Sequence, residues 1–541
     1  MIKILEKNPV ITLSIVIVLM LLVHLDVPNI TIMEARNFIT AREIVQDNNW
    51  LLTTMNGEPR YEKPPLPTWL TAISGLLFGM KNLFALRLPA AIMVLFLGVF
   101  IYFFSKKLKL SNNHALNNAL ISVTSFYIFA IINEAPWDIF AHGFMLASIY
   151  FLFKLLTSNR AIWKHVVYAA LFFGFSFLSK GPIALYALFL PFIISFGIVY
   201  KFKNFKQKLF PFISFILLGL IVGGWWFLYV RFADPQAFLE IATKETGNWS
   251  SYNVKPFYYY WSFFIQSGIW TIPAFISLLY PYLIKKVQHK KVYKFSFWWT
   301  IVAVILLSAI PEKKARYLVP VLIPLALNTG FYIQYLITNF SELKNKKETL
   351  PVYFNFGLIA TLAVALPIGL MLLLKENLQL FLLNVILTSI TSIITGVLIV
   401  KNLYLKKIKS VFYTTLLFVV VLLLFGLPIS KNFNKNGSYN SISKLQNFEQ
   451  QQNITTYSIG DVTPEMLWKH NHKIKNIYKN ELLNLPEDLN FGLLIMNNSV
   501  EKIKLELKQD YNLKLIEVYD LNVGSRKKER LIRQFYLVSK K

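Results

Sequence analysis

The chain contains no cysteine among its 541 residues. Disulfide bonds, thiolate nucleophiles and cysteine-ligated metals are therefore excluded. Charge is also scarce, because only 16% of the residues are Asp, Glu, Lys or Arg, whereas 55% are hydrophobic. A soluble domain would carry about 25% charged residues. Long apolar stretches recur through most of the chain, and a bilayer needs about 20 such residues per helix. The sequence therefore predicts a polytopic helical membrane protein.

Acidic residues are the scarcer charged class, with 28 Asp and Glu against 56 Lys and Arg, which gives a formal net charge of +28. Such an excess of positive charge would suit a nucleic-acid partner. The cations instead collect in short loops between apolar runs, where the positive-inside rule places them in membrane proteins. We therefore expect the lipid bilayer, and no nucleic acid, as a partner.

About thirteen apolar segments have the length and pattern of membrane spans. The expected helices lie at residues 9–25, 83–105, 115–133, 138–157, 164–180, 182–200, 208–230, 257–284, 295–311, 317–337, 352–375, 379–401 and 409–429. The first segment could belong to a signal peptide, but it is long for one and no small-residue cleavage site follows it. We interpret it as a retained span. The predicted fold class is an all-α polytopic membrane domain over residues 1–430.

Basic loops alternate along the chain with loops that are short or chemically mixed. The basic ones contain residues 106–109, Arg160 with Lys164, and residues 201–208, 285–294, 344–347 and 401–409. If the N-terminus, with Lys3 and Lys7, is cytoplasmic, all of these loops are cytoplasmic as well. This topology places residues 26–82, and everything after residue 430, on the external side.

Composition changes after residue 430. The segments "ITTYSIG", "FGLLIMNN", "LKLIEVYDL" and "RQFYLVS" alternate like strands, and "VEKIKLELKQ" has a helical pattern. We expect a small extracytoplasmic α/β domain over residues 431–541. It contains no obvious catalytic arrangement, so we interpret it as a lid or support for the membrane part.

The first external loop, residues 26–82, is crowded with charges. Apolar residues from Ala35 to Val45 share one helical face, which predicts an interfacial helix. On such a helix the charges of Arg42, Glu43 and Asp47 are expected to be solvated.

Further along this loop, "RYEKPP" sets Glu62 and Lys63 before two prolines and another apolar helix, on a constrained turn. A lysine held there suits a lipid phosphate, because its ammonium is a point charge with three donors. The alternative is an ordinary interface lysine that snorkels.

Three more charged residues lie at the outer ends of predicted spans. Glu134 and Asp138 occur in "NEAPWDIF", and Lys180 in "FLSKGPIAL". Asp138 is either a cap, favoured at a helix N-terminus, or a functional acid at membrane depth. Lys180 either stabilises a helix C-terminus or faces the same cavity.

Two later external segments add aromatic and cationic residues. The stretch "VKPFYYYW" begins at the end of loop 231–256, includes Lys255 and runs into the next predicted helix. Its aromatic cluster is typical of a membrane-interface belt, although aromatic faces also stack on sugars and polyprenyl chains. The turn "PEKKARYLVP" carries Lys313, Lys314, Arg316 and Tyr317. These cations oppose the positive-inside trend, and an anionic ligand would account for them.

The external side thus gathers carboxylates and cations from sequence-distant segments. The carboxylates are Glu34, Glu62 and Asp138, and the cations are Arg36, Lys63, Lys255 and Arg316. A phosphate-bearing lipid donor with a hydroxyl acceptor needs this mixture. Cations stabilise charge that develops on a leaving phosphate, and a carboxylate orients or deprotonates the attacking hydroxyl.

Several of these motifs together resemble a known family. "MEARNFITAREIVQDNNWLLTTMNGEPRYEKPPLPTWL", "APWDIF", "FLSKGPIAL", "KPFYYYW" and "KARYLVPVLIPLAL" follow one another in the family's order over about residues 30–330. They resemble the integral-membrane GT-C glycosyltransferases of the dolichyl-phosphate-mannose–protein mannosyltransferase type, most closely the bacterial aminoarabinose transferase-like branch. The family's thirteen spans and external C-terminal domain agree with the topology predicted above.

The resemblance implies an inverting glycosyltransferase with a polyprenyl-phosphate-linked sugar as donor. It implies transfer at the outer face of the bacterial inner membrane to a lipid, glycan or protein acceptor, without direct use of a nucleotide sugar. The candidate residues are Glu34 and Asp138 for catalysis, Arg36, Lys63, Tyr317 and Arg316 for the donor phosphate, and Glu62, Lys180 and Lys255 for the substrate cavity. The sequence indicates no metal-ligating residues and no particular cofactor, and leaves a divalent metal open.

One position departs from the family pattern. The family has an Asp-Glu pair where this chain has Met33-Glu34, so the aspartate assigned the leading acidic role is absent. Either Glu34 or Asp138 takes over that role, or the acceptor is an anion, such as a phosphate, and needs no strong base.

A transporter or flippase for a polyprenyl-linked glycan is the alternative function. Such a protein would carry ionisable groups near the bilayer midplane and broken helices. The charges here lie at outer helix ends, which favours chemistry at the membrane surface.

Overall fold

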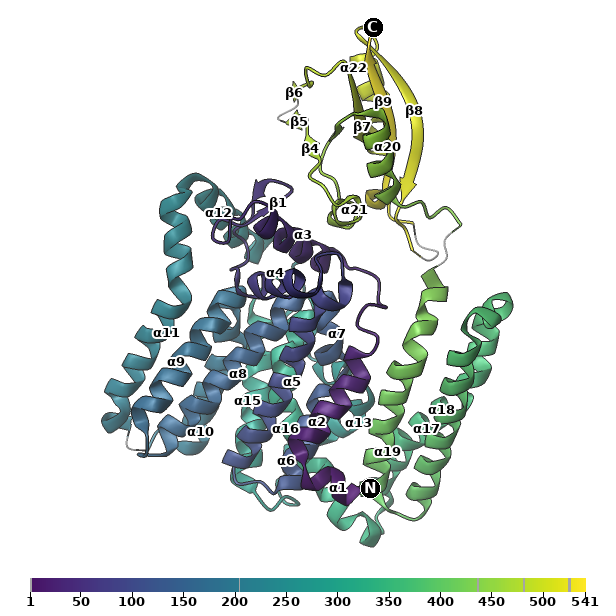
Figure 1. Cartoon of the computed structure of the whole chain (residues 1–541). Helices are drawn as coiled ribbons and strands as arrows, with labels where there is room; N and C mark the ends of the chain where they lie inside the picture. Colours follow the sequence, from purple (N-terminus) through teal and green to yellow (C-terminus); the bar gives the residue numbers. More distant parts are fainter. Residues whose placement is uncertain (1, 204, 435–436, 480–481, 524–526) are drawn as a thin grey trace.

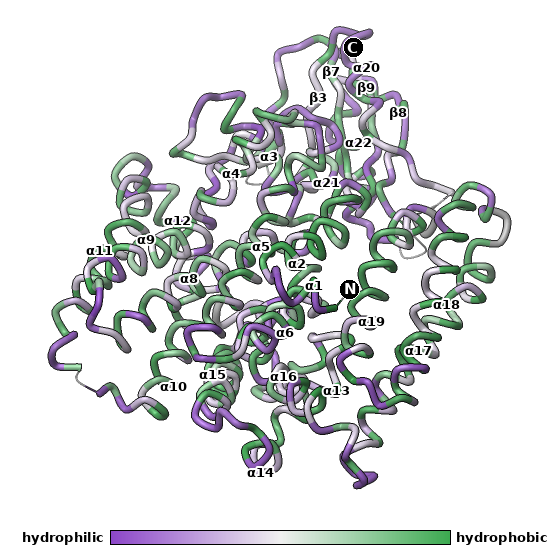
Figure 2. Tube along the Cα trace, turned by 60° about the horizontal axis from the view of Figure 1, so that its bottom comes forward, coloured by the Kyte–Doolittle hydropathy of each residue, from purple (hydrophilic) through white to green (hydrophobic). Residues whose placement is uncertain are grey.

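Long apolar helices make up most of the molecule, and a small domain built on a β-sheet stands at one end of them (Figure 1). The computed structural model describes residues 2–203, 205–434, 437–479, 482–523 and 527–541. Hydrophobic residues cover the long helices, while hydrophilic residues gather in turns at their ends and in the C-terminal domain (Figure 2). This is the polytopic helical architecture that the sequence predicts.

Within the described residues, nine helical segments are long and apolar enough to cross a membrane, or ten if a bent pair counts as one span. The nine contain α5 Leu83–Lys107, α8 Pro136–Thr157, α9 Ile162–Lys180, α11 Phe205–Ala233, α15 Lys290–Ala309, α16 Val319–Asn339, α17 Lys346–Leu374, α18 Leu382–Tyr404 and α19 Ile408–Val421. The bent pair is α6 Asn112–Val123 with α7 Phe126–Glu134, which are bent by 43°. All of these segments coincide with predicted spans.

The other three predicted spans are shorter or broken. After α1 Ile2–Lys7, the first is α2 Pro9–Ile17 with a π-helical turn to Leu22. The second is an apolar helix over Leu185–Tyr200 that includes α10 Leu190–Tyr200.

The third predicted span, 257–284, is not one continuous helix. It consists of η3 Phe257–Tyr260, η4 Phe263–Trp270, α13 Thr271–Ser277 and α14 Tyr280–Leu283. The chain turns at Gly268, whose φ is +66° and where an added Cβ would lie 3.1 Å from Phe126. A residue with a side chain would be strained there, so the glycine permits the break. The prediction of a single helix is wrong in this segment.

The first loop forms α3 Ile32–Gln46, the strands β1 Thr54–Met55 and β2 Glu58–Pro59, and α4 Leu66–Phe78. α3 begins with a capping box, in which Glu34 N donates to Thr31 Oγ1 (3.2 Å) and Thr31 N donates to Glu34 Oε2 (3.0 Å). On α3, the ring of Phe38 packs 5.4 Å from that of Trp468 in the C-terminal domain. α3 is therefore covered by that domain, where the sequence predicted a solvated surface.

Two charges on α3 are buried for this reason. Glu43 is 1% exposed and accepts N–H bonds from Asn56 (2.6 Å) and Gly57 (3.1 Å) in the β1–β2 turn. Arg42 is 4% exposed and donates to Asn471 Oδ1 (3.1 Å). The expectation that these side chains are solvated is wrong, because the hairpin and the C-terminal domain cover them.

The hairpin also binds the C-terminal domain directly. Asn56 and Gly57 have φ values of 59° and 79°, which is the geometry that Asn-Gly favours in two-residue hairpin loops. Asn56 Nδ2 donates to Ile474 O (2.7 Å), and Ile474 N donates to Asn56 Oδ1 (2.8 Å). Asp47 forms an exposed ion pair with Lys473 (2.8 Å).

The C-terminal domain contains a five-stranded sheet in the order β4-β3-β7-β9-β8, with β4, β3 and β7 parallel and the other pairs antiparallel. Its strands are β3 Thr456–Ser458, β4 Lys475–Asn476, β7 Asn490–Ile495, β8 Tyr511–Asp520 and β9 Ile532–Lys540. Its helices are α20 Leu445–Gln452, α21 Pro464–His470 and α22 Val500–Leu507, and β5 Tyr478–Lys479 pairs with β6 Leu482–Leu483. The predicted small α/β region is confirmed. The boundary at residue 430 stays a prediction.

The two ends of the helix bundle differ in what they carry. The first loop, α12 Pro235–Ser251 and the C-terminal domain lie at one end, and the N-terminus lies at the other (Figure 1). The predicted external segments therefore share one end. Which end faces the cytoplasm stays a prediction from the basic loops.

Candidate functional site

Four parts of the chain meet at the end of the bundle next to α3: the first loop, the region from α7 to α8, the end of α9 and the turn 312–317. Thr31 Oγ1 donates to Asn133 O (2.6 Å), which ties the start of α3 to the end of α7. Arg60 Nη1 donates to Arg36 O (3.0 Å) and Thr40 Oγ1 (2.8 Å), which ties loop 60–65 to α3. The start of α8, the end of α9 and the turn 312–317 complete this site.

A buried ion pair joins α8 to α9. Asp138 lies in the first turn of α8, after Pro136 at the start of the helix, and is 1% exposed. Lys180 is the last residue of α9 and donates to Asp138 Oδ1. α9 ends there because Gly181 adopts a φ of +70°. The other carboxylate oxygen of Asp138 is buried and has no hydrogen-bond partner among the described residues.

The turn 312–317 lies against this ion pair. Lys180 Nζ is 5.2 Å from the centroid of the Tyr317 ring. The Tyr317 hydroxyl donates to Glu312 Oε1 (3.1 Å), and Lys314 Nζ donates to the same oxygen (2.5 Å). Tyr317 is therefore oriented by one carboxylate, that of Glu312, and two cations, Lys314 and Lys180. The structure brings Asp138, Lys180 and Tyr317 together.

Two cations at the site have no carboxylate within ion-pair distance among the described residues. Arg36 and Arg316 are half-buried, and the Nε of each is buried without a hydrogen-bond partner. Arg316 Cζ lies 5.9 Å from the centroid of the Tyr317 ring, and Lys180 Nζ lies 5.2 Å from the same centroid, so Arg316 lies beside the Asp138–Lys180 pair. These guanidinium groups can accept an additional anion.

Loop 60–65 contributes a further pair of cations. Arg60 is 7% exposed, and its Cζ lies 5.2 Å from the centroid of the Trp137 ring. Burial lowers the pKa of Arg60 to about 10, so the side chain remains protonated at neutral pH. Lys63 Nζ donates to Glu62 O (3.0 Å) and lies 3.5 Å from Glu245 Oε2 on α12. The charge of Lys63 also acts on Lys180.

Glu62 and Lys255 lie at the edge of this group. The Glu62 side chain is 38% exposed, with Oε2 4.0 Å from Arg60 Nε. Lys255 is exposed, and its backbone N donates to Pro311 O (3.2 Å) next to the turn 312–317. The structure thus places both near the cluster but not within it, and their roles stay predictions.

Glu34 lies elsewhere. It is 0% exposed and forms a bidentate ion pair with Arg87 of α5, with distances of 2.6 Å from Nε to Oε1 and 3.1 Å from Nη2 to Oε2. Burial raises the pKa of the Glu34 carboxyl, and Arg87 opposes that shift. Both carboxylate oxygens are occupied, so this geometry favours a structural role. The catalytic role of Glu34 stays a prediction.

Lys313 and Lys314 differ from the expectation that the cations of "PEKKARY" face an anionic ligand. Lys313 is 3% exposed and donates to the carbonyl oxygens of Ile310 (2.6 Å) and Lys255 (3.1 Å). Lys314 is paired with Glu312. Lys313 is thus occupied by carbonyl oxygens and Lys314 by a carboxylate, whereas the Nε of Arg316 is buried without a hydrogen-bond partner among the described residues.

The chain is similar to known proteins both in sequence and in fold. Residues 62–226 match a family model described as dolichyl-phosphate-mannose-protein mannosyltransferase. The structure of ArnT from Cupriavidus metallidurans bound to undecaprenyl phosphate has the same fold. Its TM-score is 0.68 at 14% sequence identity, covering 98% of this chain and 97% of that one. This likeness shows that the chain has the GT-C fold.

Curated relatives of this GT-C protein include two undecaprenyl phosphate-alpha-4-amino-4-deoxy-L-arabinose arabinosyl transferases. That of Proteus mirabilis (strain HI4320), transferase 2, is 24% identical over 61% of this chain and 60% of its own length. That of Wigglesworthia glossinidia brevipalpis is 24% identical over 59% and 56%. An uncharacterized Aquifex aeolicus protein is 24% identical over 60% and 63%. The chain thus matches about three fifths of the length of these relatives.

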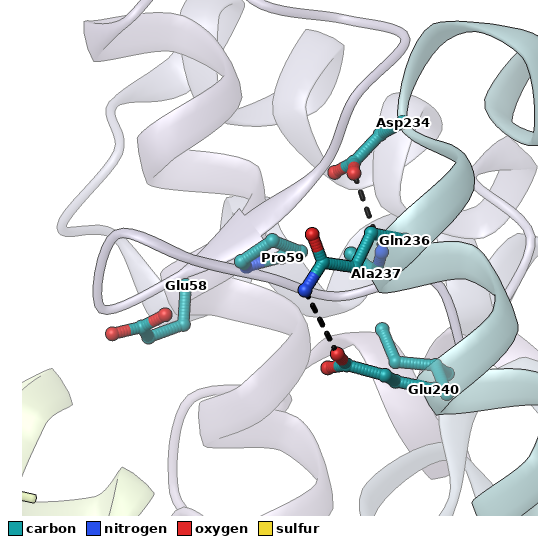
Figure 3. Close-up of a pocket in the computed structure, with 7 residues that line it drawn as sticks. Glu58, Pro59, Asp234, Gln236, Ala237 and Glu240 are labelled. Carbon is teal, nitrogen blue, oxygen red and sulfur yellow. Dashed lines mark hydrogen bonds between the residues drawn. The ribbon is translucent and has the colours of Figure 1, made fainter.

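One pocket lies between the β1–β2 hairpin and the start of α12. It has a volume of about 400 Å³ and is lined by β2 and the start of α12, including Glu58, Asp234 and Glu240 (Figure 3). Asp234 Oδ1 accepts the backbone N–H of Ala237 at the start of α12 (3.3 Å). No group of three or more His, Asp or Glu among the described residues could hold a metal ion. The expectation that no residue ligates a metal stays a prediction.

Sequence reasoning missed three charged residues, Arg60 and Glu245 at the site and Arg87, which binds Glu34 away from it. Arg87 is a lone charge in the apolar run "FALRLPAA", and a charge in such a run needs a partner. That rule could have predicted a carboxylate opposite it. Arg60 stands in the quoted motif "RYEKPP" but was not considered as a site residue. No local signal indicates that Glu245 contacts Lys63, since 182 residues separate them.

Proposed function

We propose that this chain is an inverting glycosyltransferase that moves a sugar from a polyprenyl-phosphate-linked donor to an acceptor of the cell envelope. The observation that carries this proposal is a group of cations at one end of a helix bundle with the GT-C fold. Lys180 Nζ and Arg316 Cζ lie 5.2 Å and 5.9 Å from the Tyr317 ring centroid, and Lys63 belongs to loop 60–65, which contacts Trp137 next to Asp138. A leaving phosphate develops negative charge in the transition state, and preorganised cations stabilise that charge. The names of the curated relatives and the ligand of the ArnT structure support the donor class.

In this proposal the donor phosphate binds between loop 60–65 and the turn 312–317. Lys63, Arg36 and Arg316 supply charged donors, and the ring of Tyr317, whose hydroxyl donates to Glu312, lies beside Arg316. Both guanidinium groups have a buried Nε without a partner, so each has capacity for the phosphate oxygens. Asp138 is a positioning residue that fixes the ammonium of Lys180.

The acceptor in this proposal attacks the sugar carbon from the face opposite the phosphate. One bond forms between the acceptor oxygen and that carbon, and the bond from the carbon to the phosphate oxygen breaks. Polyprenyl phosphate leaves with the electron pair, and a single displacement inverts the carbon.

The partners of the two candidate carboxylates, Glu34 and Asp138, indicate which chemical class of acceptor to expect. Glu34 is bound by Arg87, and Asp138 is bound by Lys180. Both oxygens of Glu34 are bound, whereas Asp138 has one oxygen bound by Lys180 and one without a partner among the described residues. A phosphate acceptor is already ionised and needs no proton removed, so we favour an anionic acceptor group on an envelope lipid or glycan over a neutral hydroxyl.

The proposed location of the site is the outer face of the bacterial inner membrane. The charged first loop and the C-terminal domain share one end of the bundle, while the N-terminus lies at the other end (Figure 1). The positive-inside rule assigns the basic loops to the cytoplasm, which leaves the site outside.

Mass spectrometry of envelope glycolipids from cells with and without this protein tests the proposal. We expect one sugar-modified species, shifted by the mass of one glycosyl residue, to be lost without the protein. A plasmid carrying the unaltered chain should restore it, and one carrying Lys63→Ala should not. Identical glycolipids and glycans in both strains, with the protein expressed, would contradict the proposal.

A further inference from the structure

α12 connects two segments that carry site residues. At its start, the Tyr61 hydroxyl donates to Asp234 Oδ2 (2.8 Å), which binds α12 to loop 60–65. After its end, Val254 forms a β-bridge with Glu312, which binds the chain to the turn 312–317. Between these attachments α12 places Glu245 next to Lys63, with 3.5 Å between Oε2 and Nζ.

This contact differs from the buried ion pair between Asp138 and Lys180. The side chains of Glu245 and Lys63 are 41% and 23% exposed, whereas those of Asp138 and Lys180 are 1% and 11% exposed. The distance of 3.5 Å is also long for a charge-assisted hydrogen bond. A half-exposed, long pair contributes little and is readily exchanged, while a buried pair is fixed.

The geometry points to Glu245 as an exchangeable counter-ion that competes with the donor phosphate for Lys63. This inference rests on the proposed function and adds the residue that tunes affinity at its phosphate site. When the phosphate binds, Glu245 leaves Lys63, and when polyprenyl phosphate departs, Glu245 returns. Without Glu245, Lys63 would stand near Lys180 and Arg316 with no anion of its own, and their mutual repulsion would be larger.

The exchange matters most for release of the product. In the donor the phosphate is a diester with one negative charge. After transfer it is a monoester, with a charge of about −1.5 to −2 at neutral pH. The product therefore binds the cations more tightly than the donor does. A carboxylate that returns to Lys63 lowers the affinity for the product and favours turnover.

Binding of undecaprenyl phosphate to the purified full-length protein in detergent tests this inference. Glu245→Gln keeps the shape of the side chain and removes its charge. We expect it to bind undecaprenyl phosphate roughly two- to fivefold more tightly at low ionic strength, from the strength of half-exposed pairs. The gain should shrink as salt is added.

Glu240→Gln is the matched control, because it removes the same charge from the same helix. Glu240 Oε1 accepts a hydrogen bond from Gln236 Nε2 (3.3 Å) and has no contact with Lys63. We expect its affinity for undecaprenyl phosphate to equal that of the unaltered protein. In a Lys63→Ala background, Glu245→Gln should also have no effect.

The outcomes separate this inference from the proposed function. If the unaltered protein binds and Glu245→Gln binds equally tightly, the counter-ion role is wrong and the donor site stands. An equal gain in Glu240→Gln would show a general charge effect and would also overturn it. If the unaltered protein does not bind undecaprenyl phosphate, the proposed donor class fails and this inference fails with it.

Discussion

Individual cations at the site fall into three groups by what surrounds them. Arg87 and Lys180 are held by buried carboxylates, and Lys63 is held loosely by Glu245. Arg36 and Arg316 have no carboxylate at ion-pair distance among the described residues, although Arg316 interacts with Glu134 at longer range. Lys63, Arg36 and Arg316 are therefore the cations available to an anionic ligand.

Lys63→Ala should remove transfer and weaken donor binding without unfolding the protein. Loss of one donor that stabilises a developing charge lowers kcat by roughly 10²-fold. A half-exposed lysine contributes less than about 0.5 kcal/mol to stability, so the melting temperature should be unchanged. Lys81→Ala, which removes an exposed lysine of the α4–α5 turn, should keep full activity. Unchanged turnover in Lys63→Ala would show that Lys63 only snorkels at the interface.

Glu34→Gln should lower the stability of the folded protein. It leaves the guanidinium of Arg87, 0% exposed, without its anion, which costs about 3–5 kcal/mol. The double variant Glu34→Gln with Arg87→Gln removes both charges and should regain most of the melting temperature, measured by thermal unfolding in detergent. A Glu34→Gln protein with the normal melting temperature and no transfer activity would instead make Glu34 a catalytic acid. Asp138→Asn then serves as the companion test of the other acid.

For individual residues, the sequence predicted which side chains gather in one region better than it predicted which side chains they contact. Arg36, Lys63, Asp138, Lys180 and Tyr317 lie in one region because their motifs sit at predicted helix ends on one side. The partner of Glu34 could not be read from its surroundings, because Arg87 lies 53 residues away on another helix. Long-range ion pairs depend on how helices pack, which local patterns do not encode.

The C-terminal domain, as well as the helix bundle, holds the elements of the first loop in place around the site. α3 packs on the C-terminal domain through Phe38 and Trp468, and the β1–β2 hairpin binds it through Asn56. Periodicity predicted α3 but not its cover, because the covering residues come from more than 400 positions later. The break in 257–284 was likewise missed, since hydropathy does not register the positive φ of Gly268.

Trp468→Ala should loosen α3. The substitution removes the ring that contacts Phe38 and lies 5.9 Å from the Arg42 guanidinium, at a cost of about 1–3 kcal/mol. Hydrogen exchange should be faster in residues 32–46 and unchanged in α8. Trp163→Ala, which truncates a 53% exposed ring on α9, should leave the exchange of α3 as it is. Equal protection of α3 in Trp468→Ala would mean that the C-terminal domain does not hold this helix.

On the scale of the whole molecule, the helix bundle separates the N-terminus from the charged site and the C-terminal domain (Figure 1). Alternating basic loops predicted this separation from the sequence, because each apolar helix moves the chain to the other end. The fold was predictable for that reason. Which end of the bundle faces the cytoplasm still rests on the positions of the basic loops alone.

A reporter active only outside the cytoplasm tests the orientation. Fused after residue 430, it should be active, because the C-terminal domain is then external. Fused at Lys206, in the basic segment 201–208 at the start of α11, it should be silent. A silent reporter after residue 430, with stable expression, would reverse the proposed topology and place the site in the cytoplasm.

The most direct test of the account is transfer by the purified protein in liposomes or detergent. Undecaprenyl-phosphate-linked sugars, labelled in the sugar, are supplied together with envelope lipids that carry a phosphate group. The account predicts labelled acceptor and free undecaprenyl phosphate in equal amounts, inversion at the sugar carbon, and loss of both products in Lys63→Ala. Movement of the intact donor across the liposome membrane, with its bond between sugar and phosphate unbroken, would contradict the account and identify a flippase.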